Sequence, residues 1–169
     1  MNETSVAADL SVCARCATMQ RTCCQRAEIL VTEGDIERIA AHTGRNDFWE
    51  RRVPLDPAYL EPDDDDPNWQ RYTTASDGTR RLLERRVDGD CTFLGARGCE
   101  LELDVRPLVC RIYPYSYTEQ GLDGLDDEYC PRAALSPDDR PMSELLEIPE
   151  SVAETWRARL YEELRHGDA

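Results

Sequence analysis

Apolar residues recur at helical spacing in two parts of this chain. In the first part, Ile36 and Ile39 share one helix face, and Thr32 followed by Asp35 is typical of a capped helix start. We therefore expect a helix that begins after Thr32 and ends at Gly44.

The second helical pattern covers residues 149–165. Its apolar residues form a stripe at four-residue spacing, and they are Val152, Trp156, Leu160 and Leu164. The pattern predicts an amphipathic C-terminal helix that packs over the core and stops at Gly167.

Shorter apolar runs between these helices predict strands. We expect strands at residues 28–31 and 91–94, and a hairpin whose two arms are residues 69–75 and 79–86. A further turn at residues 87–90 leads into the strand expected at residues 91–94.

Two more short helices are expected from proline and aromatic positions. Phe48 and Trp49 predict the start of one, which Pro54 closes. Pro107 is well placed as the first residue of another, which runs to about Tyr113.

These elements predict a small single α+β domain of short strands, hairpins and a few helices. Residues 1–12 are expected to be a flexible lead-in, and residues 13–169 the domain. Of the 169 residues, 40% are hydrophobic and 33% are charged, so the core is modest. A metal cross-link would stabilise such a domain considerably.

The chain is strongly acidic. It has 35 acidic against 20 basic residues, a net charge of −15, which argues against nucleic acid and anionic membrane surfaces as partners. The N-terminus lacks the features of a signal peptide, and no run approaches the roughly 18 apolar residues of a membrane span. We expect a cytoplasmic protein, and the sequence leaves its protein partners open.

Residues 61–67, with the sequence EPDDDDP, are expected to form a solvated loop. Consecutive aspartates could in principle bind calcium. This run lacks the alternating ligand spacing and the distal glutamate of a calcium loop, so we do not predict a site there.

Eight cysteines give the chain its most specific chemistry. They fall into an N-terminal quartet, Cys13, Cys16, Cys23 and Cys24, and a later quartet, Cys91, Cys99, Cys110 and Cys130. Thiols stay reduced in the cytoplasm, so metal binding explains them better than four disulfides. Four thiolates are what a zinc ion or an iron–sulfur cluster needs.

The N-terminal quartet contains two distinct spacings. Cys13 and Cys16 form a C-x2-C pair that can converge on one metal, although such a pair can also be a redox site. Cys23 and Cys24 are adjacent, and in an extended segment their side chains would point to opposite sides. They could serve two different centres, or one could be buried as a small apolar residue.

The later quartet has irregular spacing that matches neither a zinc ribbon nor the bacterial ferredoxin pattern. Arg106 and Arg111 flank Cys110, and Arg97 lies near Cys99. A thiolate centre in an acidic chain needs cations nearby, so Arg106 and Arg111 are our candidate cofactor-binding residues. The alternatives are ordinary pairing with neighbouring acids, or a clamp for a substrate carboxylate.

Three motifs combine within residues 13–131. They are the C-x2-C pair with its CC doublet, the C-T-F-L run that starts at Cys91, and R-P-x-x-C-R-x-Y-P from Arg106 to Pro114. This combination resembles the YkgJ-like cysteine-cluster family, and the resemblance implies that the cysteines bind zinc or iron. Flagellin lysine N-methylases carry a similar pattern and an iron–sulfur centre implicated in methyl transfer. This chain does not carry their long additional region, so methylase activity is not expected.

Three functions remain open. The first is a metalloprotein that binds an iron–sulfur cluster, of the four-iron type, because ligands on scattered loops can reach a large cluster. The second is an interaction module with structural zinc. The third is a metal-dependent enzyme whose pocket is lined by Tyr113, Tyr115 and Tyr117, although these tyrosines could equally pack in the core. His42 and His166 are expected to be exposed.

Overall fold

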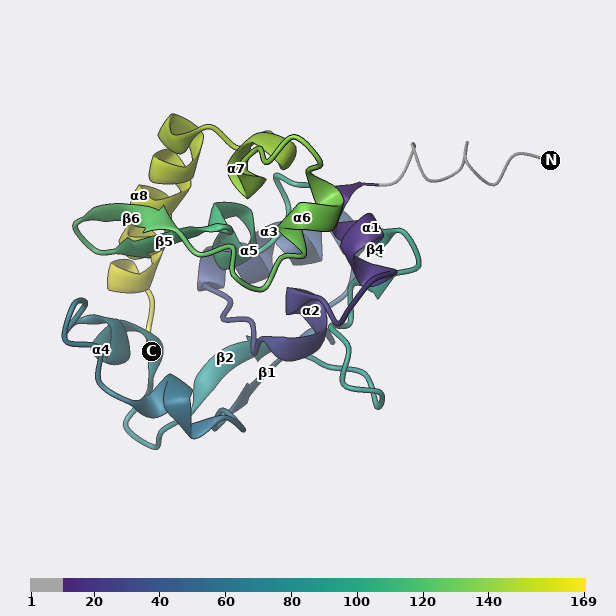
Figure 1. Ribbon diagram of the computed structural model, residues 1–169. Coiled ribbons are helices and arrows are strands. Elements are labelled where there is room, and N and C mark those ends of the chain that lie inside the picture. Colours follow the sequence, from purple (N-terminus) through teal and green to yellow (C-terminus); the bar gives the residue numbers. More distant parts are fainter. Residues whose placement is uncertain (1–10) are drawn as a thin grey trace.

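The computed structural model describes residues 11–169, which form short helices and three two-stranded antiparallel sheets (Figure 1). The α-helices are α1 (Val12–Ala17), α2 (Cys23–Arg26), α3 (Glu33–Thr43), α4 (Trp69–Thr73), α5 (Leu108–Ile112), α6 (Arg132–Leu135), α7 (Met142–Leu145) and α8 (Glu150–His166). The strands are β1 (Trp49–Arg52), β2 (Arg80–Leu83), β3 (Leu94–Gly95), β4 (Gly98–Cys99), β5 (Tyr115–Thr118) and β6 (Gly121–Leu125), and a 3-10 helix, η2, spans Pro57–Leu60. This is the expected α+β architecture.

The start of the described range belongs to a helix. Ser11 accepts a hydrogen bond from the backbone N–H of Ala14 (3.2 Å) and so caps α1, whose first residue is Val12. The rest of the expected lead-in, residues 1–10, lies outside the described residues.

Helix α3 confirms the first helical prediction. The Thr32 hydroxyl accepts from the backbone N–H of Asp35 (2.9 Å), and the Asp35 carboxylate accepts from the backbone N–H of Thr32 (3.1 Å). This reciprocal pair satisfies two N–H groups that a helix start leaves free. Gly44 ends the helix in the left-handed conformation, with φ of 69°.

Helix α8 confirms the second prediction, with a small rotation. Leu160 and Leu164 are buried as expected, but Val152 is 37% exposed and Ala153 is fully buried in its place. The helix packs against α5, β6 and α4 at one side of the molecule (Figure 1). Between residues 11 and 169, none of the helices combines the length and apolar character needed to cross a membrane.

Two predictions around residues 48–86 are wrong. Phe48 and Trp49 do not start a helix, because residues 49–52 form β1 and pair with β2. Residues 69–75 are not a hairpin arm, because α4 occupies most of them. The turn between the supposed arms does exist, with Gly78 donating to the Ala75 carbonyl (2.9 Å). At residues 49–52, pairing with a distant strand overrode the local pattern, and β2 pairs with this strand instead of with residues 69–75.

Strand β2 is the centre of the largest pairing. Besides β1 on one edge, the segment at residues 29–31 lies along its other edge, where Leu30 bridges Leu82 and Val31 donates to the Arg81 carbonyl (3.1 Å). The strand expected at residues 28–31 is therefore present as a short extended segment.

The buried apolar residues form three separate clusters. The first surrounds Phe48 and Phe93 and also includes Val31, Ile39, Leu83, Cys91, Leu94 and Leu101. The second joins α5 to α8 through Leu30, Leu108, Ile112, Leu160 and Leu164. The third is small and consists of Cys16, Leu135 and Met142. Two of the three clusters contain a cysteine.

The acidic loop at residues 61–67 is only partly solvated. Asp63, Asp64 and Asp65 are exposed, but Asp66 is 3% exposed and accepts a hydrogen bond from the Tyr161 hydroxyl on α8. One aspartate of the run thus fastens the loop to the C-terminal helix.

Glu28 fastens another loop, and its ionisation should make stability depend on pH. Its buried carboxylate accepts from the backbone N–H groups of Leu55 and Asp56 (3.0 Å each) and pairs with Arg52. Desolvation opposes the charge, but these hydrogen bonds outweigh it and lower the pKa of Glu28. A lowered pKa in the folded state stabilises the fold above the ordinary glutamate pKa, and this stability is lost as pH falls through the folded value.

We therefore expect Glu28→Gln to cost about 1.5–3 kcal/mol at neutral pH, the range for hydrogen bonds to a charged group, and less at acid pH. Urea unfolding from pH 7 to pH 3 measures this difference. Glu61→Gln, at an exposed carboxylate, is the matched control. A Glu28→Gln deficit that stays constant across this pH range would contradict the prediction.

Candidate metal centre

Helix α1 positions the first two cysteines. Cys13 and Cys16 are three residues apart, so their side chains lie on neighbouring parts of one helix face. Cys16 is buried in the small third cluster, whereas Cys13 is exposed. The helix contacts β4 and α6, which places Cys13 and Cys16 near segments from the middle of the chain.

Helix α2 presents the adjacent cysteines. Cys23 and Cys24 are its first two residues, preceded by Thr22, whose backbone N–H donates to the side chain of Gln25 (2.8 Å). The segment is helical rather than extended, and consecutive residues on a helix project about 100° apart. The two thiols therefore still diverge, as their adjacency indicated, but for a different geometrical reason.

The turn after β2 and the β3–β4 hairpin supply Cys91 and Cys99. The backbone N–H of Cys91 donates to the Cys24 carbonyl (2.9 Å), and Leu94 pairs with Cys99 across the hairpin. The strand expected at residues 91–94 is reduced to an isolated bridge between Arg85 and Cys91 and to the two residues of β3.

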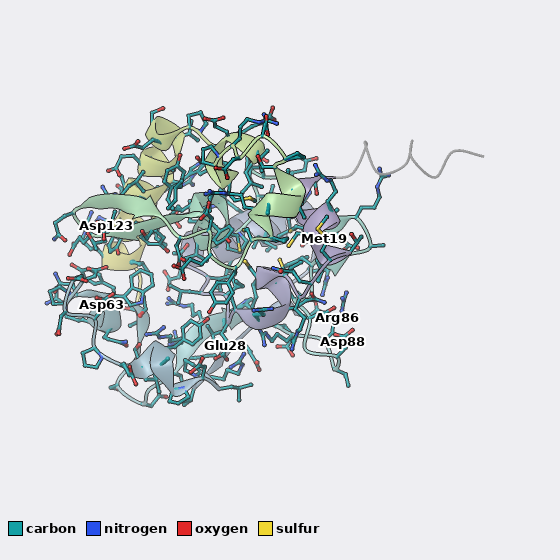
Figure 2. The ribbon with its side chains drawn as sticks, in the orientation of Figure 1. Met19, Glu28, Asp63, Arg86, Asp88 and Asp123 are labelled. Carbon is teal, nitrogen blue, oxygen red and sulfur yellow. The ribbon has the colours of Figure 1, made fainter. Side chains whose placement is uncertain are left out.

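The last two cysteines come from α5 and from the segment before α6. Cys110 is the third residue of α5, and Pro107 immediately precedes this helix, close to the prediction. Cys130 lies two residues before α6, and its sulfur is 2.8 Å from the Tyr113 hydroxyl. In Figure 2 the yellow sulfur atoms lie in the region between α1, α2 and α5.

On the outer side of this region, burial and then the charges of neighbouring thiols raise the pKa values of Cys13, Cys16 and Cys130. Desolvation is the main cause that raises the pKa of Cys13 to about 11, and neighbouring thiols add to it, namely Cys23, Cys16 and Cys130. After desolvation, Cys23 also raises the pKa of Cys16 and of Cys130. We call Cys13, Cys16, Cys23 and Cys130 the outer group.

In the interior, burial and then the charges of neighbouring thiols raise the pKa values of Cys24, Cys91 and Cys110. Desolvation raises the pKa of Cys24 to about 12, followed by the charges of Cys91 and Cys99. It also raises the pKa of Cys110 well above the ordinary value, and the next three contributions come from Cys24, Cys91 and Cys99. We call Cys24, Cys91, Cys99 and Cys110 the inner group. Smaller contributions from Cys13 and Cys23 to the pKa of Cys24 show that the two groups are neighbours.

The donor chemistry fits a thiophilic metal. All eight cysteines are free, and thiols with raised pKa values stay protonated at neutral pH until a cation displaces the protons. As the side chains stand, no three His, Cys, Asp or Glu residues between Ser11 and Ala169 are positioned to hold one metal ion. Closing either group around a metal therefore requires rotation of cysteine side chains.

The two candidate arginines have different surroundings. Arg106 lowers the pKa of Cys13, and its Nε donates to the Leu101 carbonyl (2.9 Å). Arg111 is 3% exposed, and its Nε donates to the Arg106 carbonyl (2.7 Å). Burial, then the positive charge of Arg38, lowers the pKa of Arg111. Arg106 thus lowers the pKa of a thiol in the outer group, whereas Arg111 lies toward α3.

One neighbour of the outer group escaped the sequence analysis. Arg26, two residues after Cys24, lowers the pKa of Cys16 and could have been suspected from its place beside the doublet. Tyr113 was among the three tyrosines named from the sequence, but its contact with Cys130, 17 residues further along the chain, could not be seen there.

The tyrosines of β5 pack in the core, although Tyr117 is close enough to Cys110 that, after burial, the charge of this thiol raises its pKa. Tyr117 packs against Trp69 and Tyr161, with ring centroids 6.3 and 6.4 Å away, and so belongs to the core. The Tyr115 hydroxyl donates to the Ile148 carbonyl (2.8 Å). Tyr115 also borders a shallow cavity of about 410 Å³ beside α7. Of the three tyrosines, Tyr113 is the one whose hydroxyl lies at hydrogen-bond distance from a thiol, that of Cys130. His42 and His166 are exposed, as predicted.

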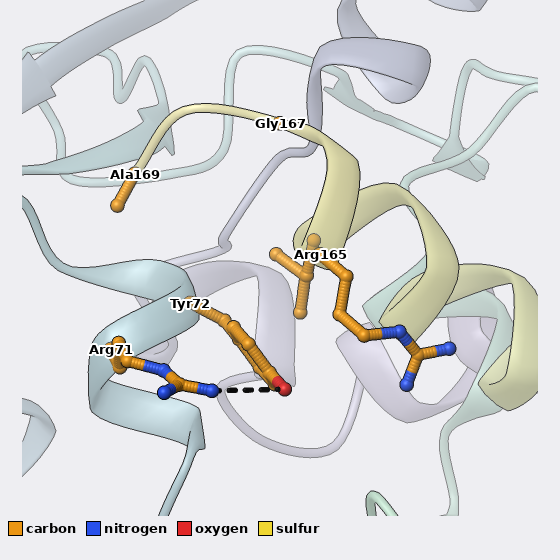
Figure 3. A pocket seen from close by; sticks show the side chains of 6 residues that line it. Arg71, Tyr72, Arg165, Gly167 and Ala169 are labelled. Atoms are coloured by element: carbon orange, nitrogen blue, oxygen red, sulfur yellow. Dashed lines mark hydrogen bonds between the residues drawn. The ribbon is translucent and has the colours of Figure 1, made fainter.

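A cavity of about 360 Å³ lies between α4 and the end of α8 (Figure 3). It is lined by Arg71, Tyr72, Leu164, Arg165, Gly167 and Ala169. Arg71 donates to the Tyr72 hydroxyl (3.4 Å) across one side of it. This cavity has no cysteine in its lining and is separate from both groups.

Gly98 lies where α1 contacts the β3–β4 hairpin. Its φ is +96°, and a Cβ there would lie 3.3 Å from the Ser11 hydroxyl that caps α1. We expect Gly98→Ala to weaken metal binding by the outer group and to destabilise the fold by about 1–2 kcal/mol through backbone strain. Gly124→Ala is the matched control, because Gly124 has φ of +101° and no atom within 4 Å of the added Cβ.

Metal content and urea unfolding of the two variants distinguish the effect of backbone strain from the effect of the contact between the added Cβ and α1. Both should lose stability, but only Gly98→Ala should lose metal. Equal metal content in both variants would show that the contact with α1 does not matter.

Tyr113→Phe tests the contact with Cys130. Partners that hydrogen-bond to a metal ligand typically contribute 10- to 100-fold to metal affinity. We expect a loss of roughly this size in a chelator competition assay, with little change in the circular dichroism spectrum. Tyr115→Phe removes a hydroxyl that bonds only to backbone, and its metal affinity should match the wild type.

Comparison with curated proteins and with solved structures yields no match to this chain. A protein-family model does match residues 12–131, and its description is CxxCxxCC, "Putative zinc- or iron-chelating domain". The matched span starts at the first residue of α1 and ends just after Cys130, so it contains all eight cysteines.

Proposed function

Because the chain belongs to this CxxCxxCC family of zinc- or iron-chelating domains, we propose that it chelates metal at two separate centres. The outer group, Cys13, Cys16, Cys23 and Cys130, would hold one, and the inner group, Cys24, Cys91, Cys99 and Cys110, the other. The free thiols of both groups suit a reducing compartment, and we propose a cytoplasmic location.

The observation that carries this proposal is the divergence at the doublet. In addition to burial, the charge of Cys23 raises the pKa of Cys13, Cys16 and Cys130. Cys24 instead accepts a backbone hydrogen bond from Cys91, and, in addition to burial, its charge raises the pKa of Cys110. Adjacent residues on one helical turn cannot aim both thiols at one small ion without distortion. Once its side chains rotate toward a common centre, each group of four would supply a complete thiolate shell.

We further propose that each centre holds an iron–sulfur cluster of the four-iron type. The ligands of each group come from three or four separated segments, an arrangement that a large cluster can bridge more easily than a single ion. A cluster bound there by four thiolates would supply electron transfer. The chain itself would hold the cluster, donate a hydrogen bond from Tyr113, and partly offset the thiolate charge with Arg106 and Arg26.

Anaerobic purification followed by metal and sulfide analysis tests the proposal. Two four-iron centres predict about eight iron and eight sulfide per chain, with a brown colour that bleaches in air. A colourless protein with about two zinc ions per chain would keep the two centres but replace the cluster with zinc. One metal centre per chain, or none, would overturn the two-centre proposal.

A further inference from the structure

We propose that the two centres divide the work: the outer centre exchanges its metal with the surroundings, and the inner centre retains its metal and holds the fold. This inference rests on the proposed function, since it assigns roles to the two groups defined above. It follows from where the two sets of ligands sit relative to the core.

The inner ligands are built into the main body of the molecule. Cys91 is 7% exposed and is a member of the cluster around Phe48 and Phe93, against which Cys24 and Cys99 pack. Cys110 lies on α5, whose Leu108 and Ile112 are fully buried against α8. Releasing a metal from these residues requires opening the largest hydrophobic clusters of the domain, which is a rare event in a native protein.

The outer ligands sit on short elements at the rim. Cys13 is exposed as a residue, although its thiol lies among neighbours that desolvate it, and α1 is held mainly by contacts with β4 and α6. Buried apolar support on this side comes from Ala14 and from the small cluster of Cys16, Leu135 and Met142. Local opening of such a segment needs far less free energy than unfolding of the core.

The rim around the outer group also offers a surface for an incoming ligand. Tyr129 is 60% exposed and Met19 is 48% exposed, although both lie next to the cysteine segments. Arg26 stacks over the Tyr129 ring at 5.5 Å, and Met19 donates its backbone N–H to the Cys16 carbonyl (2.9 Å). A thiol ligand that approaches Cys13 therefore meets an open, partly apolar edge rather than a closed core.

Exchange there would proceed by ligand replacement. An incoming thiol binds the metal as a thiolate while the Cys13 thiolate leaves and takes up the proton that the incoming thiol releases. The number of metal–sulfur bonds, the charge and the oxidation state are all unchanged. The class of partner implied is a thiol-bearing metal acceptor or donor.

Timed metal release tests this division of roles. The full-length protein, purified without oxygen, is incubated with excess EDTA, and samples are desalted and analysed for metal and for helical circular dichroism. We expect half of the metal to leave at least about tenfold faster than the rest, with the helical signal intact. The slow half should leave together with the helical signal.

Cysteine variants show which centre gives rise to the fast phase of metal release and which to the slow phase. Cys13→Ser should lack the fast half from the start and release the remaining half at the wild-type slow rate, and Cys130→Ser should behave in the same way. A single rate for all metal, or loss of all metal in both variants, would overturn the inference. Protein that contains no metal before EDTA is added would instead refute the proposed function, so the two failures are distinguishable.

Discussion

Replacing Cys110 with serine should produce a chain that does not keep its native fold. Cys110 belongs to the inner group and sits on α5 between two fully buried residues, Leu108 and Ile112. Structural metal sites contribute about 10–16 kcal/mol to folding, whereas small domains have a net stability of about 5–15 kcal/mol. Loss of the inner metal therefore removes most or all of that margin.

The matched comparison is Cys13→Ser, an equal chemical change at an exposed ligand of the outer group. We expect this variant to keep a cooperative thermal transition and about half of the wild-type metal. Circular dichroism melts and metal analysis of the two variants measure the difference. If Cys110→Ser melts with the same midpoint as Cys13→Ser, the inner centre does not hold the fold.

The second large effect is expected at Asp35, which is fully buried. Its carboxylate accepts from the backbone N–H groups of Thr32 and Leu108 (3.1 Å each) and pairs with Arg38 (2.6 Å). One carboxylate thus caps α3, holds the start of α5 and balances a partly buried cation. Burial raises its pKa, and the surrounding donors act against that rise.

Asp35→Ala leaves the two backbone N–H groups without an acceptor, whereas Arg38 keeps its ion pair with Glu163 (2.6 Å). Each buried donor left unsatisfied costs about 1–3 kcal/mol, so we expect a loss of about 2–6 kcal/mol by urea unfolding. Asp47→Ala, which removes an exposed partner of Arg45, should leave the stability close to that of the wild type. A loss at Asp35 no larger than at Asp47 would show that the contact between α3 and α5 is dispensable.

The parts of the fold that could be predicted are those with complete local signals. Helix α3 carries its own cap, its apolar face and its stop glycine, and α8 carries a long apolar stripe. Strand β1 carries none of these, since Trp49–Arg52 becomes a strand only by pairing with β2, far along the chain. Local sequence could not indicate that partner.

The candidate site divides in the same way. The cysteines, the C-x2-C spacing and the divergence of the doublet are visible in the sequence, because they depend on residue type and adjacency. Which later cysteine joins which earlier one is not visible. Cys130 reaches the outer group because α6 packs beside α1, and Cys91 reaches the inner group through its hydrogen bond to Cys24. Both are consequences of tertiary contacts.

The adjacency of Cys23 and Cys24 would also couple the loading of the two proposed centres. Helix α2 is four residues long, so anchoring Cys24 in the inner group orients Cys23 toward the outer one. The first metal to bind would bear the entropy of ordering this helix, and the second would find its ligand already in place. Loading of the two proposed centres would then be positively cooperative, and by thermodynamic reciprocity each filled centre would tighten the other.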